Sequence, residues 1–169
     1  MSKYDTKIIL IEVRTYEGKK KLDSLLYDNN KKLKKLFNYD KKEALSFTKE
    51  DREKVKDKFG VCVIFDGKKP VFVGQTSGYS ATYKPINKYL FTKLGQYNAH
   101  SDAGTTKFRK GYAQSKELNL DNLKSITALE HGLTFQYIKV KDEPAFINIL
   151  KILALEYAKA KGYVLYNFE

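Results

Sequence analysis

The sequence predicts a single α/β domain with a small three-stranded sheet, mixed or antiparallel, flanked by helices. The first observation is the stretch GVCVIFDGKKPVFVGQT, residues 60–76, in which two apolar runs surround an Asp-Gly pair. This pattern is a strong β-hairpin signal. The second is LTFQYIKV, residues 133–140, which alternates apolar and polar residues as a strand does. With 169 residues, 42% of them hydrophobic, the chain is long enough for one folded core.

An N-terminal extension, residues 1–59, precedes the main domain, residues 60–169. Residues 7–13, KIILIEV, are rich in β-branched residues and predict a strand. Residues 19–37 have leucines at helical spacing, with a potential break at Asp-Asn-Asn 28–30. Thr48, followed three residues later by Asp51, can cap a short helix that we expect to end near Lys58.

The main domain continues with the two hairpin strands, expected over 60–65 and 70–74. A long loop rich in Gly, Ser, Thr and Tyr follows and then becomes helical, through residues 93–98. The segment SDAGTT, residues 101–106, predicts another loop, and a short helix is expected over 108–113.

The third strand, residues 133–140, leads into the longest predicted helix, residues 143–161. Pro144 suits the first turn of this helix and Gly162 suits its C-terminal end.

The charge of the chain indicates a polyanionic partner. The net charge is +12, with 29 lysines and 3 arginines. Residues 60–116 hold 9 basic and 2 acidic groups, a net charge of +7. A basic segment of this kind indicates nucleic acid, and DNA in particular is expected; a lysine-rich proteome in which every protein drifts basic is the alternative. Lysine favours phosphate contacts over base reading, because arginine is the usual bidentate base reader.

Several classes of protein are excluded. The sequence has no apolar run of roughly 20 residues, so we expect no membrane helix. It shows no signal peptide, and its single cysteine, Cys62, cannot form an intramolecular disulfide, so we expect a cytoplasmic protein. A P-loop, a dinucleotide glycine fingerprint, HExxH and Cys/His zinc spacing are all absent from the sequence.

Glu156 is the first candidate for chemistry. The predicted helix 143–161 has an apolar stripe made of Phe146, Ile149, Leu150, Leu153 and Tyr157. Glu156 falls on or beside that stripe, where a carboxylate is costly unless it is paired. It either pairs with a lysine at the edge of the stripe or binds a metal. Mg²⁺ prefers carboxylate oxygen and keeps several waters, so one Glu can suffice beside a phosphate.

The order of the motifs over residues 60–167 resembles the GIY-YIG nuclease superfamily. Gly60-Val61-Cys62 stands where the first triplet of the family would be, and Phe72-Val73-Gly74 where the second would be. The family's later residues match, in order, Lys93, Tyr97, Glu156 and Asn167.

This resemblance implies a metal-dependent DNA endonuclease of restriction or mobile-element type. In the family, the first Tyr assists the attack of water, an Arg stabilises charge on the phosphate and a Glu holds one divalent metal. Carried over, these roles place Mg²⁺ or Mn²⁺ on Glu156. They also imply one concave catalytic site formed by Cys62, Phe72, Lys93, Tyr97, Glu156 and Asn167.

The chain departs from the family at four of those positions. Cys62 and Phe72 replace the two tyrosines, Lys93 replaces the arginine and Tyr97 replaces the histidine. Phe72 has no hydroxyl, Lys93 has no bidentate fork, and a cysteine on a buried strand is usually inert. The alternative is therefore a catalytically lapsed domain that binds nucleic acid or a protein partner. A third reading is an unrelated α/β domain with accidental spacing.

Other residues could compensate or bind phosphate. A hydroxyl from Tyr79, Tyr83 or Tyr89 could enter the site, although ordinary packing is the commoner role of a tyrosine. The expected nucleic-acid contacts are Lys68, Lys69, Lys88, His100, Lys107, Arg109 and Lys110. For Arg109 a structural salt bridge is an equal alternative, and a histidine at a loop end, such as His100, is more often a hydrogen-bonding group than a catalytic one.

Overall fold

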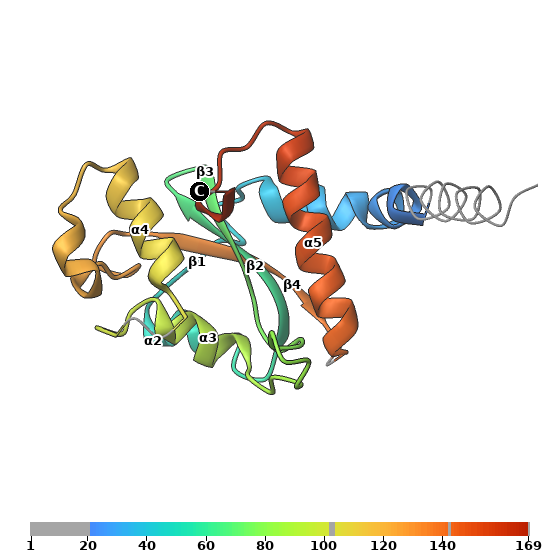
Figure 1. The fold of residues 1–169 in the computed structure, drawn as a ribbon, viewed down its shortest axis with the longest axis horizontal. Coiled ribbons are helices and arrows are strands. Elements are labelled where there is room, and N and C mark those ends of the chain that lie inside the picture. The colour runs from blue at the N-terminus through green and yellow to red at the C-terminus, as the bar shows by residue number, and fades with distance from the viewer. Residues whose placement is uncertain (1–20, 102–103, 142, 169) are drawn as a thin grey trace, which may run out of the picture.

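A computed structural model describes residues 21–101, 104–141 and 143–168, which form a four-stranded antiparallel sheet flanked by helices (Figure 1). The strand order is β1-β4-β2-β3. The strands are β1 (Leu45–Ser46), β2 (Phe59–Asp66), β3 (Lys69–Gln75) and β4 (Thr134–Val140). The sheet thus has four strands instead of the predicted three, because β1 adds to β4. The strand expected over 7–13 lies outside the described residues.

The predicted hairpin is confirmed. Asp66 pairs with Lys69, which leaves Gly67 and Lys68 in the turn, and Gly67 has a φ of +59° that favours glycine. The register places Cys62 opposite Gly74. Because β4 pairs with β2 along its whole length, the hairpin and the predicted third strand belong to one sheet.

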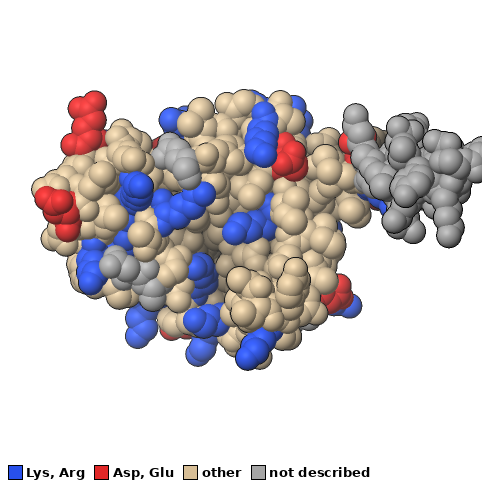
Figure 2. All heavy atoms as spheres, viewed as in Figure 1, with Lys and Arg blue, Asp and Glu red and all other residues tan. Residues whose placement is uncertain are grey.

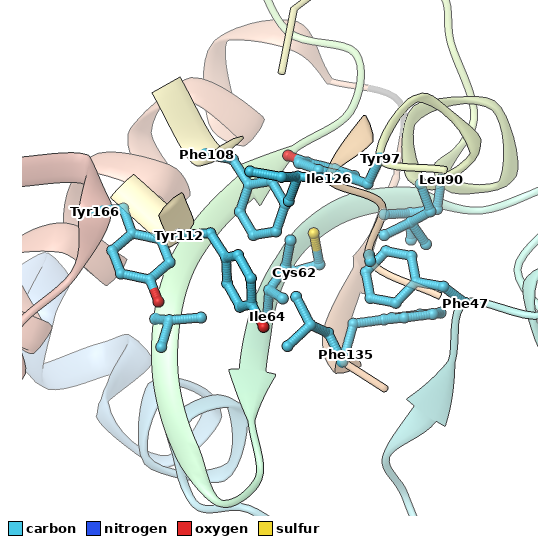
Figure 3. Close-up of a cluster of buried hydrophobic side chains, with 14 of the residues drawn as sticks. Phe47, Cys62, Ile64, Leu90, Tyr97, Phe108, Tyr112, Ile126, Phe135 and Tyr166 are labelled. Atoms are coloured by element: carbon cyan, nitrogen blue, oxygen red, sulfur yellow. The ribbon is translucent and has the colours of Figure 1, made fainter. Parts of the chain in front are cut away.

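β2 is buried on both faces, and its side chains alternate between two cores. Cys62 and Ile64 point into one apolar cluster, whose rings and aliphatic groups surround the thiol in Figure 3. Val61, Val63 and Phe65 point into the other. The sequence of a strand that is buried on both faces is a continuous apolar run, without alternating polar residues.

Helices cover both faces of the sheet (Figure 1). The N-terminal helix, described over 21–37, and α5 (Pro144–Ala160) pack on one face, where both contribute buried side chains to the second core. The other face is covered by α2 (Lys49–Glu53), α3 (Leu90–Gln96) and α4 (Thr106–Ser115). Two short 3₁₀ helices, η1 (Leu120–Ser125) and η2 (Tyr166–Phe168), complete the described elements.

The helix predictions are confirmed with adjusted ends. Pro144 occupies the first turn of α5, and Gly162 follows its end with a φ of +71°. The hydroxyl of Thr48 accepts a hydrogen bond from the backbone N–H of Asp51 at 3.3 Å, as the capping pattern predicts. The helix α2 ends at Glu53, earlier than expected, and hydrogen-bonded turns follow it. The N-terminal helix continues through 28–30 without the potential break.

Part of the predicted extension belongs to the same cores as the main domain. Leu33 and Phe37 of the N-terminal helix pack with β2 and α5, while Phe47 and Val55 pack in the cluster that contains Cys62. Within the described residues, no helix combines the length and the apolar character needed to cross a membrane.

Gly60 is required by a close approach between β2 and β4. A Cβ atom at this position would lie 1.9 Å from the backbone oxygen of Ile138. We expect Gly60→Ala to lower the free energy of unfolding by about 2–4 kcal/mol, because two paired strands must move apart. Urea denaturation measures the loss. Gly162→Asn is the matched control, because Gly162 has open space around it and asparagine tolerates its left-handed backbone. An unchanged stability of Gly60→Ala would contradict the pairing of β2 with β4 described here.

Candidate functional site: a lysine-lined pocket

A pocket of about 420 Å³ lies against the C-terminal half of β3. β3 and the loop after it, α3 and its C-terminal cap, and α5 each contribute to its wall. The lining residues are Phe72, Val73, Gly74, Gln75, Thr76, Ser77, Ile86, Lys88, Lys93, Gln96, Tyr97, Gly104 and Lys151. Figure 2 shows basic groups gathered around a hollow on this face, while the acidic groups visible in the view lie nearer its margins.

The pocket is packed tightly where β3 passes over the core. A Cβ atom on Gly74 would lie 3.0 Å from the hydroxyl of Tyr97 and 3.1 Å from the Sγ of Cys62. Phe72 stands beside them, with its ring centroid 6.2 Å from that of Tyr97 in an edge-to-face arrangement. Cys62, Phe72, Tyr97 and Lys93 therefore lie close to one another.

Neither Cys62 nor Tyr97 is an ionised group at neutral pH. Burial raises the pKa of the Cys62 thiol to about 11, although the positive charges of Lys93 and Lys151 oppose this shift. Burial also raises the pKa of the Tyr97 hydroxyl well above its ordinary value. The nucleophile of a cysteine is its thiolate, so a thiol held in this state is a packing group.

Lys93 and Lys151 bring two half-buried ammonium groups to the pocket. Burial lowers the pKa of Lys93, and the positive charges of Lys151 and Lys88 lower it further. Burial likewise lowers the pKa of Lys151, with a further contribution from Lys107. The Nζ of Lys93 donates hydrogen bonds to the Oε1 of Gln96 at 3.1 Å and to the carbonyl of Gly104 at 3.2 Å.

Within the part of the chain that the structure describes, no carboxylate lines this pocket. Lys151 makes no hydrogen bond or ion pair with another described residue. Two partly desolvated cations that line one pocket, with no carboxylate among its described lining residues, cost stability. A bound anion would offset this cost.

Glu156 lies outside the pocket. Its carboxylate forms an ion pair with Lys159 at 3.2 Å, and its side chain is 42% exposed. The expected convergence on one site therefore fails for this residue. Lys151 and Glu156 are five residues apart on α5, which separates them by about 140° around the helix axis.

The reason is the rotation of α5. Its buried face is formed by Ile147, Leu150, Leu153, Ala154 and Ala158. The predicted stripe contained Ile149, which is exposed, and lacked Ile147 and the two alanines. The true apolar face is thus rotated from the predicted one, and Lys151 is the α5 side chain that reaches the pocket.

The residues present do not fit a divalent metal at this pocket. Mg²⁺ and Mn²⁺ take hard oxygen ligands, especially carboxylates. Among the described residues, no group of three or more His, Cys, Asp or Glu side chains could hold a metal ion.

Asn167 has a structural role at the edge of the sheet. Its Oδ1 accepts a hydrogen bond from the backbone N–H of Val73 at 2.7 Å, and its Nδ2 donates to the Val73 carbonyl at 3.0 Å. The side-chain amide thus pairs with the open edge of β3 as another strand would. It satisfies backbone groups that would otherwise be available for edge-to-edge pairing.

Arg109, which we expected to contact phosphate or to form a structural salt bridge, is part of the packing of the fold in this structure. Its side chain is fully buried, and its guanidinium donates to the carbonyls of Gln96 and Ala99 and to those of Leu123 and Lys124. It therefore ties the segment after α3 to η1.

The remaining predicted basic contacts are divided between two regions. Lys88 lines the pocket, and Lys107 is close enough to lower the pKa of Lys151. Lys110 lies beside Lys107 on a neighbouring shallow hollow. Lys68 and Lys69 are at the hairpin turn, at the opposite end of β3 from Gly74.

The last of the predicted contacts, the exposed His100, shares a hydrogen bond with the carbonyl of Lys124 through its Nδ1, which agrees with the role of a loop-end hydrogen-bonding group.

None of the three loop tyrosines lines the pocket. Tyr83 is 83% exposed, and the ring of Tyr89 packs on Phe59 with centroids 4.6 Å apart. The backbone N–H of Tyr79 donates to the side chain of Asn148. A hydroxyl that would replace the missing motif tyrosines is therefore not supplied from this loop.

Comparison of the chain with protein-family models, with curated proteins and with solved structures finds no match.

The uncompensated charge of Lys151 makes a prediction about stability. Its pKa is lower in the folded state than in the unfolded chain, so its charge destabilises the fold at neutral pH. This cost disappears as the pH rises through the lowered pKa toward 10.5. We expect Lys151→Met to raise the melting temperature at pH 7 by about 1–3 °C, with a smaller gain at pH 10. Differential scanning calorimetry measures both values.

Lys34→Met is the control for this substitution, because Lys34 is an exposed lysine of the N-terminal helix. We expect it to leave the melting temperature nearly unchanged. A loss of stability in Lys151→Met would mean that the ammonium group is compensated in the folded protein.

Proposed function

We propose that this protein binds nucleic acid through the lysine pocket, as a binding module and not as a nuclease. The observation that carries the proposal is the pair of half-buried ammonium groups, Lys93 and Lys151, in a pocket whose described lining holds no carboxylate. Phosphate is the anionic group of nucleic acid, and it dominates the affinity of basic proteins for nucleic acid. Lysine binds phosphate as a point charge.

The surroundings of the two lysines support a polymeric ligand. Lys88 stands at the same pocket, and Lys107 and Lys110 continue the positive charge along α4. Successive phosphates of a backbone that leaves the pocket would meet these exposed side chains. Part of the positive charge of residues 60–116 thus lies where the phosphate backbone of a bound nucleic acid would pass.

Phe72 favours a single strand over a duplex. Its ring is half-buried and forms part of the pocket wall, held edge-to-face by Tyr97 and Phe108 at centroid distances of 6.2 and 5.6 Å. An unpaired base can stack on an aromatic ring of this kind, and such stacking contributes about 1–3 kcal/mol per base. A base inside a duplex is not available for that contact.

The endonuclease hypothesis has one observation in its favour, the gathering of Cys62, Phe72, Lys93 and Tyr97 at one pocket. Against it stand the buried protonated thiol and the position of Glu156 outside the pocket. Hydrolysis of a phosphodiester needs an activated water and a cation at the developing charge. Among the described side chains of the pocket, the lysines could stabilise the developing charge. No ionised group there could activate the water.

The proposal predicts salt-dependent binding that requires the pocket. We expect Lys93→Gln combined with Lys151→Gln to weaken the binding of a fluorescein-labelled 15-nucleotide single strand at least tenfold. The slope of log K against log salt should become shallower by about 1.4, since each lysine–phosphate contact on a single strand contributes about 0.7. Fluorescence anisotropy over a series of NaCl concentrations measures both quantities.

Lys68→Gln combined with Lys69→Gln is the matched control, because it removes the same charge from the distant hairpin turn. We expect it to change affinity less than twofold. Equal losses in the two double variants would show that net charge alone drives binding and would overturn the pocket proposal.

The same samples, incubated with plasmid DNA and Mg²⁺ or Mn²⁺, test hydrolysis, with Glu156→Ala as the reference. Cleavage by the unmodified chain that Glu156→Ala abolishes would restore the endonuclease hypothesis.

A further inference from the structure

A second basic groove lies at the opposite edge of the sheet from Asn167. β1 pairs only with Thr134 and Phe135, so the rest of β4 has no neighbouring strand on that side among the described residues. The groove beside it has a volume of about 470 Å³. Its lining residues are Lys32, Lys35, Leu36, Glu43, Leu45, Lys54, Gln136, Tyr137, Ile138 and Lys139.

The ladder shows which backbone groups of β4 face this groove. The carbonyl of Gly60 accepts a hydrogen bond from the backbone N–H of Thr76, so the backbone groups of Gly60 point toward β3. In an antiparallel sheet, the backbone groups of the next residue point toward the neighbouring strand on the other side. Val61 therefore faces β4 and its partner there, Ile138. By the same alternation, Tyr137 and Lys139 direct their backbone N–H and C=O groups toward the open edge.

The backbone groups at the two edges of the sheet differ in their hydrogen bonding. At β3, the side chain of Asn167 satisfies both backbone groups of Val73. At β4, neither Tyr137 nor Lys139 has a comparable cap among the described residues, and Lys139 is exposed. An open edge of this kind is a template for another extended chain.

Positive charge stands on both sides of the open edge. Lys32 and Lys35 come from the N-terminal helix, on the face of the sheet that it shares with α5, while Lys54 follows α2 on the other face. Lys35 pairs with Glu43 at 2.9 Å and Lys54 with Asp51 at 2.6 Å. Lys32 and Lys139 make no ion pair with a described residue.

Apolar groups lie between the charges. Leu36, Leu45 and Ile138 form part of the groove wall, which gives apolar side chains of a bound strand a surface to bury. A strand that entered here would direct alternate side chains toward the two faces, and each face presents both lysine and leucine.

We propose that the open edge of β4 binds an extended acidic peptide of a partner protein as an added strand. Tyr137 and Lys139 each present a backbone N–H donor and a C=O acceptor at the open edge. A peptide backbone supplies a partner for both groups, whereas a phosphate backbone has no donor for the carbonyls. A second copy of the chain would bring the same lysines against each other. This site is separate from the lysine pocket and does not depend on the function proposed there.

The experiment uses the full chain and two fluorescein-labelled peptides. One consists of three Glu-Val repeats, and the other has the same sequence with every backbone nitrogen methylated. Methylation keeps the charge and removes the hydrogen-bond donors. Fluorescence anisotropy should show saturable binding of the first peptide and at least tenfold weaker binding of the second. Equal binding of the two peptides, or binding of neither, would overturn the proposal.

Two variants of one residue separate charge from backbone. Lys139→Ala keeps the backbone N–H and loses the charge, whereas Lys139→Pro also removes the donor on the open side, leaving the pairing with β2 intact. We expect a two- to fivefold loss of peptide affinity in Lys139→Ala and more than tenfold in Lys139→Pro. Circular dichroism checks that both variants fold, and the methylated peptide decides the question if Lys139→Pro does not.

Lys93→Gln combined with Lys151→Gln is the control from the other site and should leave peptide binding unchanged. If the acidic peptide does not bind and Lys139→Ala weakens the binding of the single-stranded oligonucleotide instead, the groove is a nucleic-acid surface and the proposal of strand addition is wrong.

Discussion

The burial of β2 on both faces is the constraint on which the rest of this structure depends. Each of its apolar side chains needs cover from a different layer, Val61 and Val63 from α5 and the N-terminal helix, and Cys62 and Ile64 from the helices on the opposite face. The strands on either side, β3 and β4, then become the two flanks of the sheet. The lysine pocket lies along β3, and the groove of the further inference lies along β4.

The lysine pocket follows from how closely β3 approaches the core. Because Gly74 has no side chain, the thiol of Cys62 and the hydroxyl of Tyr97 can lie directly beneath the backbone of β3. α3 and α5 cannot close over that point without burying Lys93 and Lys151 completely. The pocket is thus the place where sheet packing stops and the partly buried ammonium groups of Lys93 and Lys151 face solvent, which costs stability.

The sequence predicted what local patterns determine. The Asp-Gly turn, the strand β4, the Thr48 cap and the ends of α5 are each predicted from a few adjacent residues, and each is confirmed. β1 could not be predicted, because two residues carry no period. The phase of α5 was missed because Ile147 and Ile149 are equally apolar and the two alanines that share the buried face with Ile147 carry a weak apolar signal.

Arg109 was also beyond the reach of the sequence. Arginine is the residue most often expected at a phosphate, and only the fold shows that the carbonyls of four separate residues meet around this one. The burial that makes it structural comes from η1 and the segment after α3, which are distant from each other along the chain.

Three of the residues that carry the resemblance to a nuclease family, Gly60, Gly74 and Asn167, have a packing reason in this molecule. Gly60 is needed where a side chain would strike the carbonyl of Ile138, Gly74 where one would strike Tyr97, and Asn167 where β3 would otherwise end in an open edge. The positions that would carry chemistry hold a protonated thiol and a ring without a hydroxyl. The packing of a hairpin against helices can by itself require the two glycines and the asparagine. The motif order is therefore evidence about how the strands pack, while the lysines are the evidence about what the protein binds.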